Sequence, residues 1–212
     1  MEPLIRKIMA KAPKEDKGGA SEEKFCWIDI IAPEQASGLL AEIYNAVVSP
    51  DGNVDHLYQA QSLMPETITA QDALYKSVLQ STSNVLPGWF HEAVGVYTSL
   101  LNNCKYAAVH HGANMAHLLN DAERSADIIN AFKRDTPETA FNGKNLKLLR
   151  YARRLVKLPG EITRDHVESL RRSGIVDREI LEVNQVVALF SYFNRVISGL
   201  GISLGREKIG LY

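Results

Sequence analysis

The stretch that decides the fold is HEAVGVYTSLLNNCKYAAVHHGANMAHLL, residues 91–119. Apolar residues recur every three or four positions on both sides of Asn102 and Asn103, which is the spacing of two α-helices joined by a tight turn. Asparagine breaks one helix and caps another, so Asn103 is expected to cap the second. The stretch therefore predicts a helical hairpin that carries a carboxylate in its first helix and a thiol and imidazoles in its second.

The rest of the chain is divided into helical segments by residues that start or end helices. Apolar residues keep the helical spacing from Pro33 onward, and no alternation typical of strands persists. Helix starts are expected near the following residues: Pro33, Pro65, Asp121, Asn142 or Gly143, Thr163 and Asp177. The sequence therefore predicts an all-α fold with about eight or nine helices in a single domain, residues 25–212.

Composition and charge are those of an ordinary globular chain. Its 212 residues suffice for one buried core, and 24 basic against 25 acidic residues leave a formal charge of −1. This balance predicts no nucleic-acid-binding surface and no basic segment for a membrane surface. No apolar run approaches the roughly 20 residues that span a bilayer. Two cysteines are too few for a disulfide framework, so we expect a reducing, cytoplasmic location.

The two ends of the chain differ in character. Residues 1–24 have no sustained apolar face, so we expect a mobile arm, and Arg6, Lys7 and Lys11 leave no signal-peptide core. In contrast, EILEVNQVVALFSYFNRVISGLG, residues 179–201, is apolar on nearly every side. Such a helix lies at the centre of a core or between subunits, so we expect a homo-oligomer.

Glu92, Cys104 and His111 are the candidate catalytic residues. Cys104 is expected at the start of its helix, where unpaired backbone N–H groups favour a thiolate and lower the cysteine pKa. His111 follows seven residues later, about two turns, so both lie on one face, where the small Ala107 and Ala108 leave space. Glu92 lies twelve residues before Cys104 on the preceding antiparallel helix, and a carboxylate in an apolar helix needs a partner. Together they predict a pocket for general acid–base or thiol chemistry.

Structural roles stay open for each of these residues, since a helical cysteine often fills the core and a buried histidine often only forms a hydrogen bond. Tyr106 and His110 are expected to line or support the pocket, and core packing explains them equally well. His91, His110 and His117 lack the spacing of a zinc site, so metal binding is a minor hypothesis and we predict no metal. The glycines of residues 199–205 follow a helix rather than a strand, so we predict no nucleotide cofactor.

This arrangement resembles the AhpD-like or carboxymuconolactone decarboxylase superfamily, and within it the peroxidase-related group. The family motif is a glutamate, eleven intervening residues and then Cys-x-x-Cys-x-x-x-His, and Glu92, Cys104 and His111 match its glutamate, first cysteine and histidine. The similarity continues in residues 43–66, 86–94 and 177–202, and it covers roughly residues 28–204. It implies an all-helical fold that assembles as a homo-oligomer, such as a trimer or hexamer.

The chain departs from the motif at position 107, where alanine stands in place of the second cysteine. The resemblance assigns to that cysteine the attack on a hydroperoxide, to the glutamate and histidine the relay of its proton, and to the first cysteine the formation of a disulfide. The expected function is therefore that of a peroxidase-related, alkylhydroperoxidase-like oxidoreductase with one thiol. In it, Cys104 works with a Glu92/His111 relay on a small molecule such as a hydroperoxide. Two alternatives stay open: a carboxymuconolactone decarboxylase-like acid–base enzyme that uses Glu92 and His111, and a catalytically inactive helical oligomer.

Overall fold

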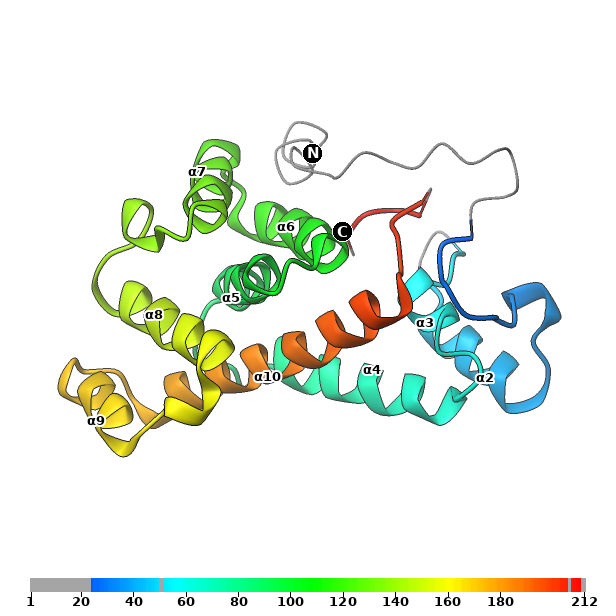
Figure 1. Ribbon diagram of the computed structural model, residues 1–212, viewed down its shortest axis with the longest axis horizontal. Helices are drawn as coiled ribbons and strands as arrows, with labels where there is room; N and C mark the ends of the chain where they lie inside the picture. The colour runs from blue at the N-terminus through cyan, green and yellow to red at the C-terminus, as the bar shows by residue number, and fades with distance from the viewer. Residues whose placement is uncertain (1–23, 50–51, 206, 211–212) are drawn as a thin grey trace.

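The computed structural model describes residues 24–49, 52–205 and 207–210, and over this part of the chain it contains nine α-helices and no strand (Figure 1). The all-α fold predicted from the sequence is therefore confirmed. The helices are α2 (Gly38–Val47), α3 (His56–Gln59), α4 (Pro65–Leu79), α5 (Gly88–Leu101), α6 (Lys105–Leu119), α7 (Ala122–Lys133), α8 (Gly143–Lys157), α9 (Arg164–Arg172) and α10 (Asp177–Leu200). Short 3-10 helices occupy Pro33–Gln35, Pro137–Thr139 and Pro159–Glu161. Apart from Lys24, the predicted mobile arm of residues 1–24 lies outside the described residues.

Helices α5 and α6 form the predicted hairpin and lie side by side at the centre of the molecule (Figure 1). The chain reverses at Asn103, whose φ of 58° lies in the left-handed region that asparagine tolerates. The N–H of Cys104 then bonds the carbonyl of Ser99 at 2.8 Å, and Cys104 becomes the N-cap of α6 in place of the predicted Asn103. Every residue of α5 from Phe90 to Ser99 is buried, because α6, α8 and α10 all pack against this helix.

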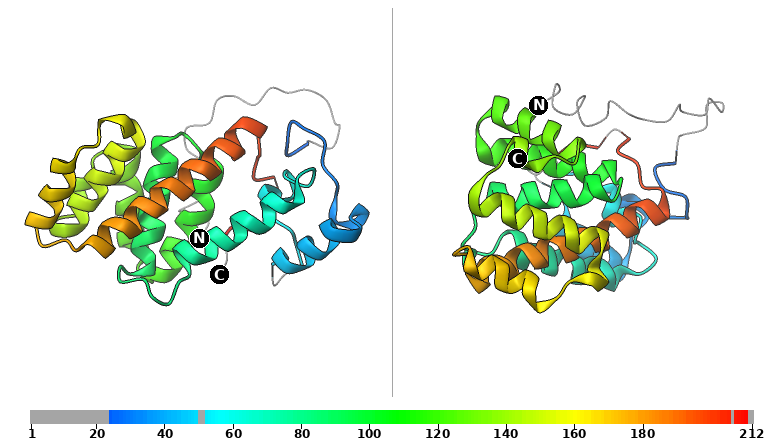
Figure 2. Two further views of the ribbon diagram at one scale, coloured as in Figure 1. Left: turned by 90° about the horizontal axis from the view of Figure 1, so that it is seen from below. Right: turned by 60° about the vertical axis from the view of Figure 1, so that its left-hand side comes forward.

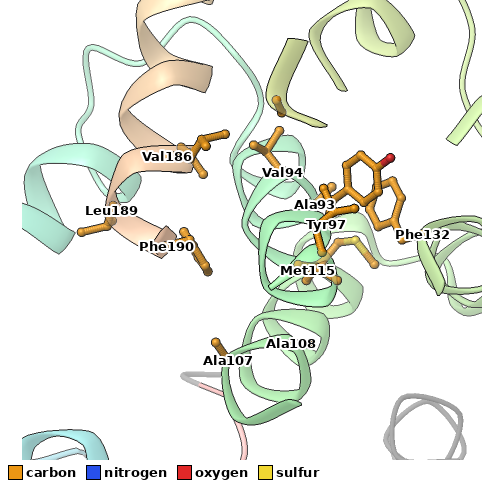
Figure 3. Packing of buried hydrophobic residues seen from close by; sticks show 14 of the residues in the cluster. Ala93, Val94, Tyr97, Ala107, Ala108, Met115, Phe132, Val186, Leu189 and Phe190 are labelled. Atoms are coloured by element: carbon orange, nitrogen blue, oxygen red, sulfur yellow. The ribbon is translucent and has the colours of Figure 1, made fainter. Parts of the chain in front are cut away.

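Helix α10 packs against both helices of the hairpin, and the left view of Figure 2 shows it running diagonally across them. Its buried apolar side chains are Ile180, Val183, Val186, Val187, Leu189, Phe190, Phe193 and Ile197. In Figure 3, Val186 points toward Val94 of α5. The opposite side of α10 is exposed and carries Leu181 and Tyr192, which are 50% and 41% exposed. The chain therefore covers only one side of this helix, and the homo-oligomer stays a prediction. Within the described ranges, no helix is long and apolar enough to cross a membrane.

A glycine in the middle of α5 allows α10 to approach closely. A Cβ atom built on Gly95 would lie 2.2 Å from Cζ of Phe190, far inside van der Waals contact. Both residues are buried, and the Phe190 ring packs in turn edge-on against the ring of His111, with centroids 4.4 Å apart. The missing side chain at position 95 thus sets where a candidate catalytic residue lies.

The predicted helix starts hold where a local cap marks them. Asp121 accepts a hydrogen bond from the N–H of Arg124 at 2.9 Å, Thr163 caps α9, and α4 begins at Pro65. One start was misplaced, since Pro33 begins only a 3-10 helix and α2 starts at Gly38. Helix α10 begins at Asp177 as predicted, although its N-cap is Val176 and not Asp177, the cap that the sequence suggests.

Candidate active site

The structure brings Glu92 and His111 into direct contact across the α5–α6 hairpin. Oε2 of Glu92 lies 2.6 Å from Nδ1 of His111, and the glutamate is buried, with 4% of its surface exposed. A carboxylate only accepts hydrogen bonds, so Nδ1 of His111 carries a proton and donates a hydrogen bond to Glu92. In the neutral form of the imidazole, the lone pair therefore lies on Nε2.

The surroundings hold both side chains in place. Asn114, one turn further along α6, donates from Nδ2 to the other oxygen of Glu92 at 3.4 Å. The ring of His111 packs against Phe190 of α10, and Tyr75 of α4 lies 6.1 Å away between ring centroids. The imidazole is therefore oriented by one short hydrogen bond and by aromatic side chains from two other helices.

His111 forms part of the wall of a cavity of about 240 Å³. The wall near the imidazole consists of Tyr106, Ala107, His110 and Asn114 of α6, Tyr75 of α4, and Phe193 and Ile197 of α10. The remaining wall comes from the end of α2, from α3 and from the C-terminal segment after α10. Glu92 lies behind His111 and does not line the cavity. The imidazole thus stands between a buried carboxylate and a space that a small molecule can enter.

Cys104 does not belong to this wall. The residue is 3% exposed, and burial raises the pKa of its thiol, although the backbone N–H of Ala107 and the hydroxyl of Ser198 partly offset this effect. The expectation that the helix start lowers the pKa of Cys104 is therefore wrong, because the cost of placing a charge in the core exceeds the gain from the helix. The second cysteine, Cys26, is also buried, and both thiols are free.

The two alanines after Cys104 lie in different environments. Ala107 lines the cavity and lies on the side of α6 that faces α10 (Figure 3). Ala108 is fully buried in the core and does not line the cavity, so the prediction that both leave space on one face holds only for Ala107. Tyr106 and His110 line the cavity.

The histidines proposed as a minor metal hypothesis do not converge. His91 is buried and bonds Glu182 through Nε2 at 3.1 Å, whereas Nε2 of His110 lies 3.3 Å from Oε1 of Glu207. In the part of the chain that the structure describes, no group of three or more histidine, cysteine, aspartate or glutamate residues is arranged to hold a metal ion.

The sequence analysis missed the C-terminal segment, which closes one side of the cavity. Glu207, Lys208 and Gly210 all line it. The carboxylate of Glu207 accepts from the backbone N–H of His56 at 2.9 Å and from Nε2 of His110, while the N–H of Gly210 donates to Nδ1 of His110 at 3.3 Å. His110 is therefore neutral with its proton on Nε2, because Nε2 donates to Glu207 and Nδ1 accepts from Gly210. The segment is not helical, so no hydrophobic period marked it.

A second polar group lies at the α4 side of the cavity. Asp72 accepts from Nζ of Lys76 at 2.7 Å and from the phenol of Tyr58 at 3.3 Å, and all three residues line the wall. Burial and the charge of Asp72 raise the pKa of Tyr58, so this phenol stays protonated. The cavity therefore has an apolar middle between the imidazole and a charged rim.

Comparison with known proteins identifies the fold and leaves the activity open. No family model and no curated protein matches the chain. The chain is similar to a crystal structure of an alkylhydroperoxidase AhpD core, an uncharacterized peroxidase-related protein from Ralstonia eutropha JMP134. The two sequences are 18% identical, the TM-score is 0.73, and the match covers 85% of this chain and 93% of that one. An uncharacterized peroxidase-related protein from Silicibacter sp. TM1040 is 22% identical with a TM-score of 0.72, over 88% and 95%.

A third solved structure has an enzyme's name. A cysteine-to-alanine variant of the debrominase Bmp8 in complex with 2,3,4-tribromopyrrole is 14% identical with a TM-score of 0.66, over 85% of this chain and 94% of that one. Identities this low show the fold alone. The chain has the all-α AhpD-like fold, and its structural neighbours include peroxidase-related proteins and a debrominase.

Proposed function

We propose that this chain is an acid–base enzyme in which His111, oriented by Glu92, transfers a proton on a small molecule held in the cavity. The observation that carries this proposal is the 2.6 Å contact between Nδ1 of His111 and Oε2 of Glu92, with the imidazole in the cavity wall. A general base needs a free lone pair directed at its substrate, and the carboxylate provides it by holding the proton on the other nitrogen.

The buried carboxylate also stabilises the charged state of the histidine. When Nε2 takes a proton from the substrate, the imidazolium forms next to Glu92, whose negative charge balances it in a poorly solvated position. Nε2 then returns the proton to another atom of the same molecule. One histidine thus acts as base and acid in turn, as an isomerisation or a decarboxylation requires.

The cavity indicates the kind of substrate. Tyr75, Phe193 and Ile197 give it an apolar middle, and Asp72 and Lys76 give it a polar rim. Ala107 adds only a methyl group beside the imidazole, and the small side chain leaves room for the reacting atoms. We infer a small, largely apolar molecule with one polar end and an acidic C–H bond. Unsaturated lactones and β-keto acids meet this description.

The test is a substrate screen with matched variants. The panel contains lactones, β-keto acids and halogenated pyrroles, the last because one structural neighbour is in complex with 2,3,4-tribromopyrrole. Uptake of deuterium from D₂O into each compound is followed by NMR. Turnover should fall about 10²–10⁴-fold in His111→Gln and stay within about twofold in Cys104→Ala, which removes no group from the wall. His117→Gln, exposed on the same helix, is the matched control. Turnover that survives in His111→Gln but is lost in Cys104→Ala refutes the proposal.

The two roles of Glu92 can be separated. Glu92→Gln keeps a carbonyl oxygen that can accept from Nδ1 but removes the negative charge, whereas Glu92→Ala removes both. Nitrogen-15 NMR of the imidazole should therefore show the Nδ1–H tautomer of His111 in the wild type and in Glu92→Gln, and a mixture in Glu92→Ala. Activity should already fall in Glu92→Gln, because the imidazolium has lost its counter-charge.

A peroxidase is the second candidate, and the similarity in fold to peroxidase-related proteins favours it. In that reaction the thiolate of Cys104 attacks a hydroperoxide, an alcohol leaves, and an external thiol must reduce the sulfenic acid, since position 107 is alanine. Burial and the raised pKa of Cys104 oppose this step. Hydroperoxide consumption that disappears in Cys104→Ser and persists in His117→Gln is the result that establishes the peroxidase.

A further inference from the structure

A second concave site lies between α8 and α9, at the opposite end of the molecule from α2 and α3 (Figure 1). Its volume is about 500 Å³, twice that of the cavity at His111. Five cationic side chains of α8 line it, namely Lys147, Arg150, Arg153, Arg154 and Lys157, and His166 of α9 lines the other wall. No carboxylate is among its described lining residues. In a chain of net charge −1 this is a strong local excess of positive charge.

The spacing of these cations destabilises α8 when no anion lies in the groove. Lys147, Arg150, Arg154 and Lys157 are separated by three, four and three residues, so they form one row along α8. Like charges at these spacings destabilise a helix by about 0.2–0.5 kcal/mol per pair. Arg154 has a partner in Glu161 at 3.2 Å, and Nζ of Lys157 donates to the carbonyl of Leu101 at 2.8 Å. Among the described residues, no carboxylate lies within ion-pair distance of Lys147, Arg150 or Lys157.

The opposite wall adds neutral donors that suit oxygen atoms. Ser169 of α9 and Ser173, the C-cap of α9, line the groove. The hydroxyl of Ser173 accepts from Nζ of Lys147 at 2.6 Å and donates to the carbonyl of Ser169 at 2.9 Å, so a bound anion would have to displace these contacts to use it. His166 uses Nδ1 to cap α9 through Thr163, at 3.1 Å from its N–H, so its Nε2 is left for the groove. Cationic and hydroxyl groups that face one another across a groove are the groups that bind phosphate oxygens.

We propose that this groove binds a compact polyphosphate anion, such as the phosphate chain of a nucleotide or a short inorganic polyphosphate, with Arg150 at its centre. The row from Lys147 to Lys157 is about 15 Å long at 1.5 Å per residue, which exceeds a single phosphate group and suits a short chain of them. Asp135 and Glu161 pair with the lining residues Arg153 and Arg154 and so flank the groove. These carboxylates repel an anion that extends beyond the groove, which favours a compact ligand over a nucleic acid.

The experiment measures binding of sodium tripolyphosphate to the full chain by calorimetry at low ionic strength. Arg150→Glu and Lys147→Glu should each weaken binding at least about tenfold, because each turns an attraction into a repulsion. Arg150→Lys should keep most of the affinity. Arg195→Glu changes the net charge equally on the exposed side of α10, away from the groove, and should stay within about twofold. His111→Gln should bind like the wild type, so this result is independent of the proposed enzyme activity.

Three outcomes overturn the proposal. Equal losses in Arg195→Glu and Arg150→Glu show that only the general charge of the surface attracts the anion. Unchanged binding in Arg150→Glu places the anion elsewhere. The groove belongs to a macromolecular partner if a single-stranded oligonucleotide, or vesicles that contain phosphatidylserine, bind more tightly than tripolyphosphate at equal salt. Circular dichroism of each variant establishes that it is folded, as expected for exchanges at exposed positions.

Discussion

Gly95→Ala tests whether the close packing of α5 against α10 is as tight as the structure has it. The new Cβ would lie 2.2 Å from Cζ and 2.6 Å from two further atoms of the Phe190 ring. Carbon atoms pack at about 3.5–4.0 Å, so the ring or the helix must move by about 1.3 Å or more. Phe190 is fully buried between α5, His111 and Phe193, so the ring has no free direction in which to move.

The expected magnitude follows from two opposing effects. Overpacking of a buried site costs about 1–3 kcal/mol, and an overlap this large belongs at the upper end. Alanine in place of glycine stabilises a helix interior by about 1 kcal/mol. We therefore expect a net loss of about 2 kcal/mol in the free energy of unfolding, or about 4–8 °C in Tm for a chain of this size. The displaced ring should also move His111, so turnover of any substrate should fall.

Urea denaturation of matched variants provides the measurement. Gly199→Ala is the control, since a Cβ at that helical position meets nothing within 4 Å, and it should be neutral or stabilising by up to about 1 kcal/mol. Phe190→Leu in the Gly95→Ala background should recover part of the loss, because the shorter side chain removes the overlapping ring atoms. A Gly95→Ala variant as stable as Gly199→Ala would refute the close approach and the role of Gly95 in placing His111.

Four further predictions concern other buried groups. Burial lowers the pKa of His91 despite its hydrogen bond to a carboxylate, so as the pH falls the unfolded chain binds a proton that the folded chain does not. The free energy of unfolding should therefore fall from pH 7 toward pH 5. Denaturant titrations at each pH should show a flatter profile for His91→Gln. With Cys26 replaced by serine, Cys104 should react with an aromatic disulfide reagent at neutral pH more slowly than free cysteine, because its pKa is raised. Ala107→Cys should place a thiol in the cavity wall that this reagent labels faster than Cys104, and equal rates would contradict the different environments of the two positions. Glu207→Gln should cost about 1–3 kcal/mol in the free energy of unfolding in urea, because a buried acceptor of several donors loses its charge.

The fold was predictable to the extent that local chemistry determines it. Asp121 and Thr163 mark helix starts because their side chains bond the first turn of the same helix. Helix α3 is four residues long, too short to show a period, and it went unnoticed. The C-terminal segment around Glu207 was missed for a related reason, since its position depends on the backbone of His56 and the ring of His110, more than ninety residues away in the chain.

The candidate site, like the fold, was predictable only where local chemistry determines it. Glu92 was identified because a carboxylate inside an apolar helix needs a partner, and only the next helix of the hairpin was near enough to supply one. The environment of Cys104 could not be predicted from its own helix. Burial raises the pKa of its thiol and the hydroxyl of Ser198 lowers it, and both effects depend on the tertiary fold. Position within a helix indicated a thiolate, and the core around it favours the thiol.

Positions 104 and 107 are the reason we propose proton transfer rather than thiol chemistry. Cys104 caps α6 and is enclosed by the core, whereas position 107 opens on the cavity one helical turn before His111. A reactive side chain at position 107 would lie next to the imidazole, and this chain has a methyl group there. The carboxylate and imidazole nevertheless keep a 2.6 Å contact with the ring in the wall. A buried carboxylate can stabilise an imidazolium without a reacting thiol beside it, so the proposed acid–base enzyme needs its second proton-exchanging group from the molecule that enters the cavity.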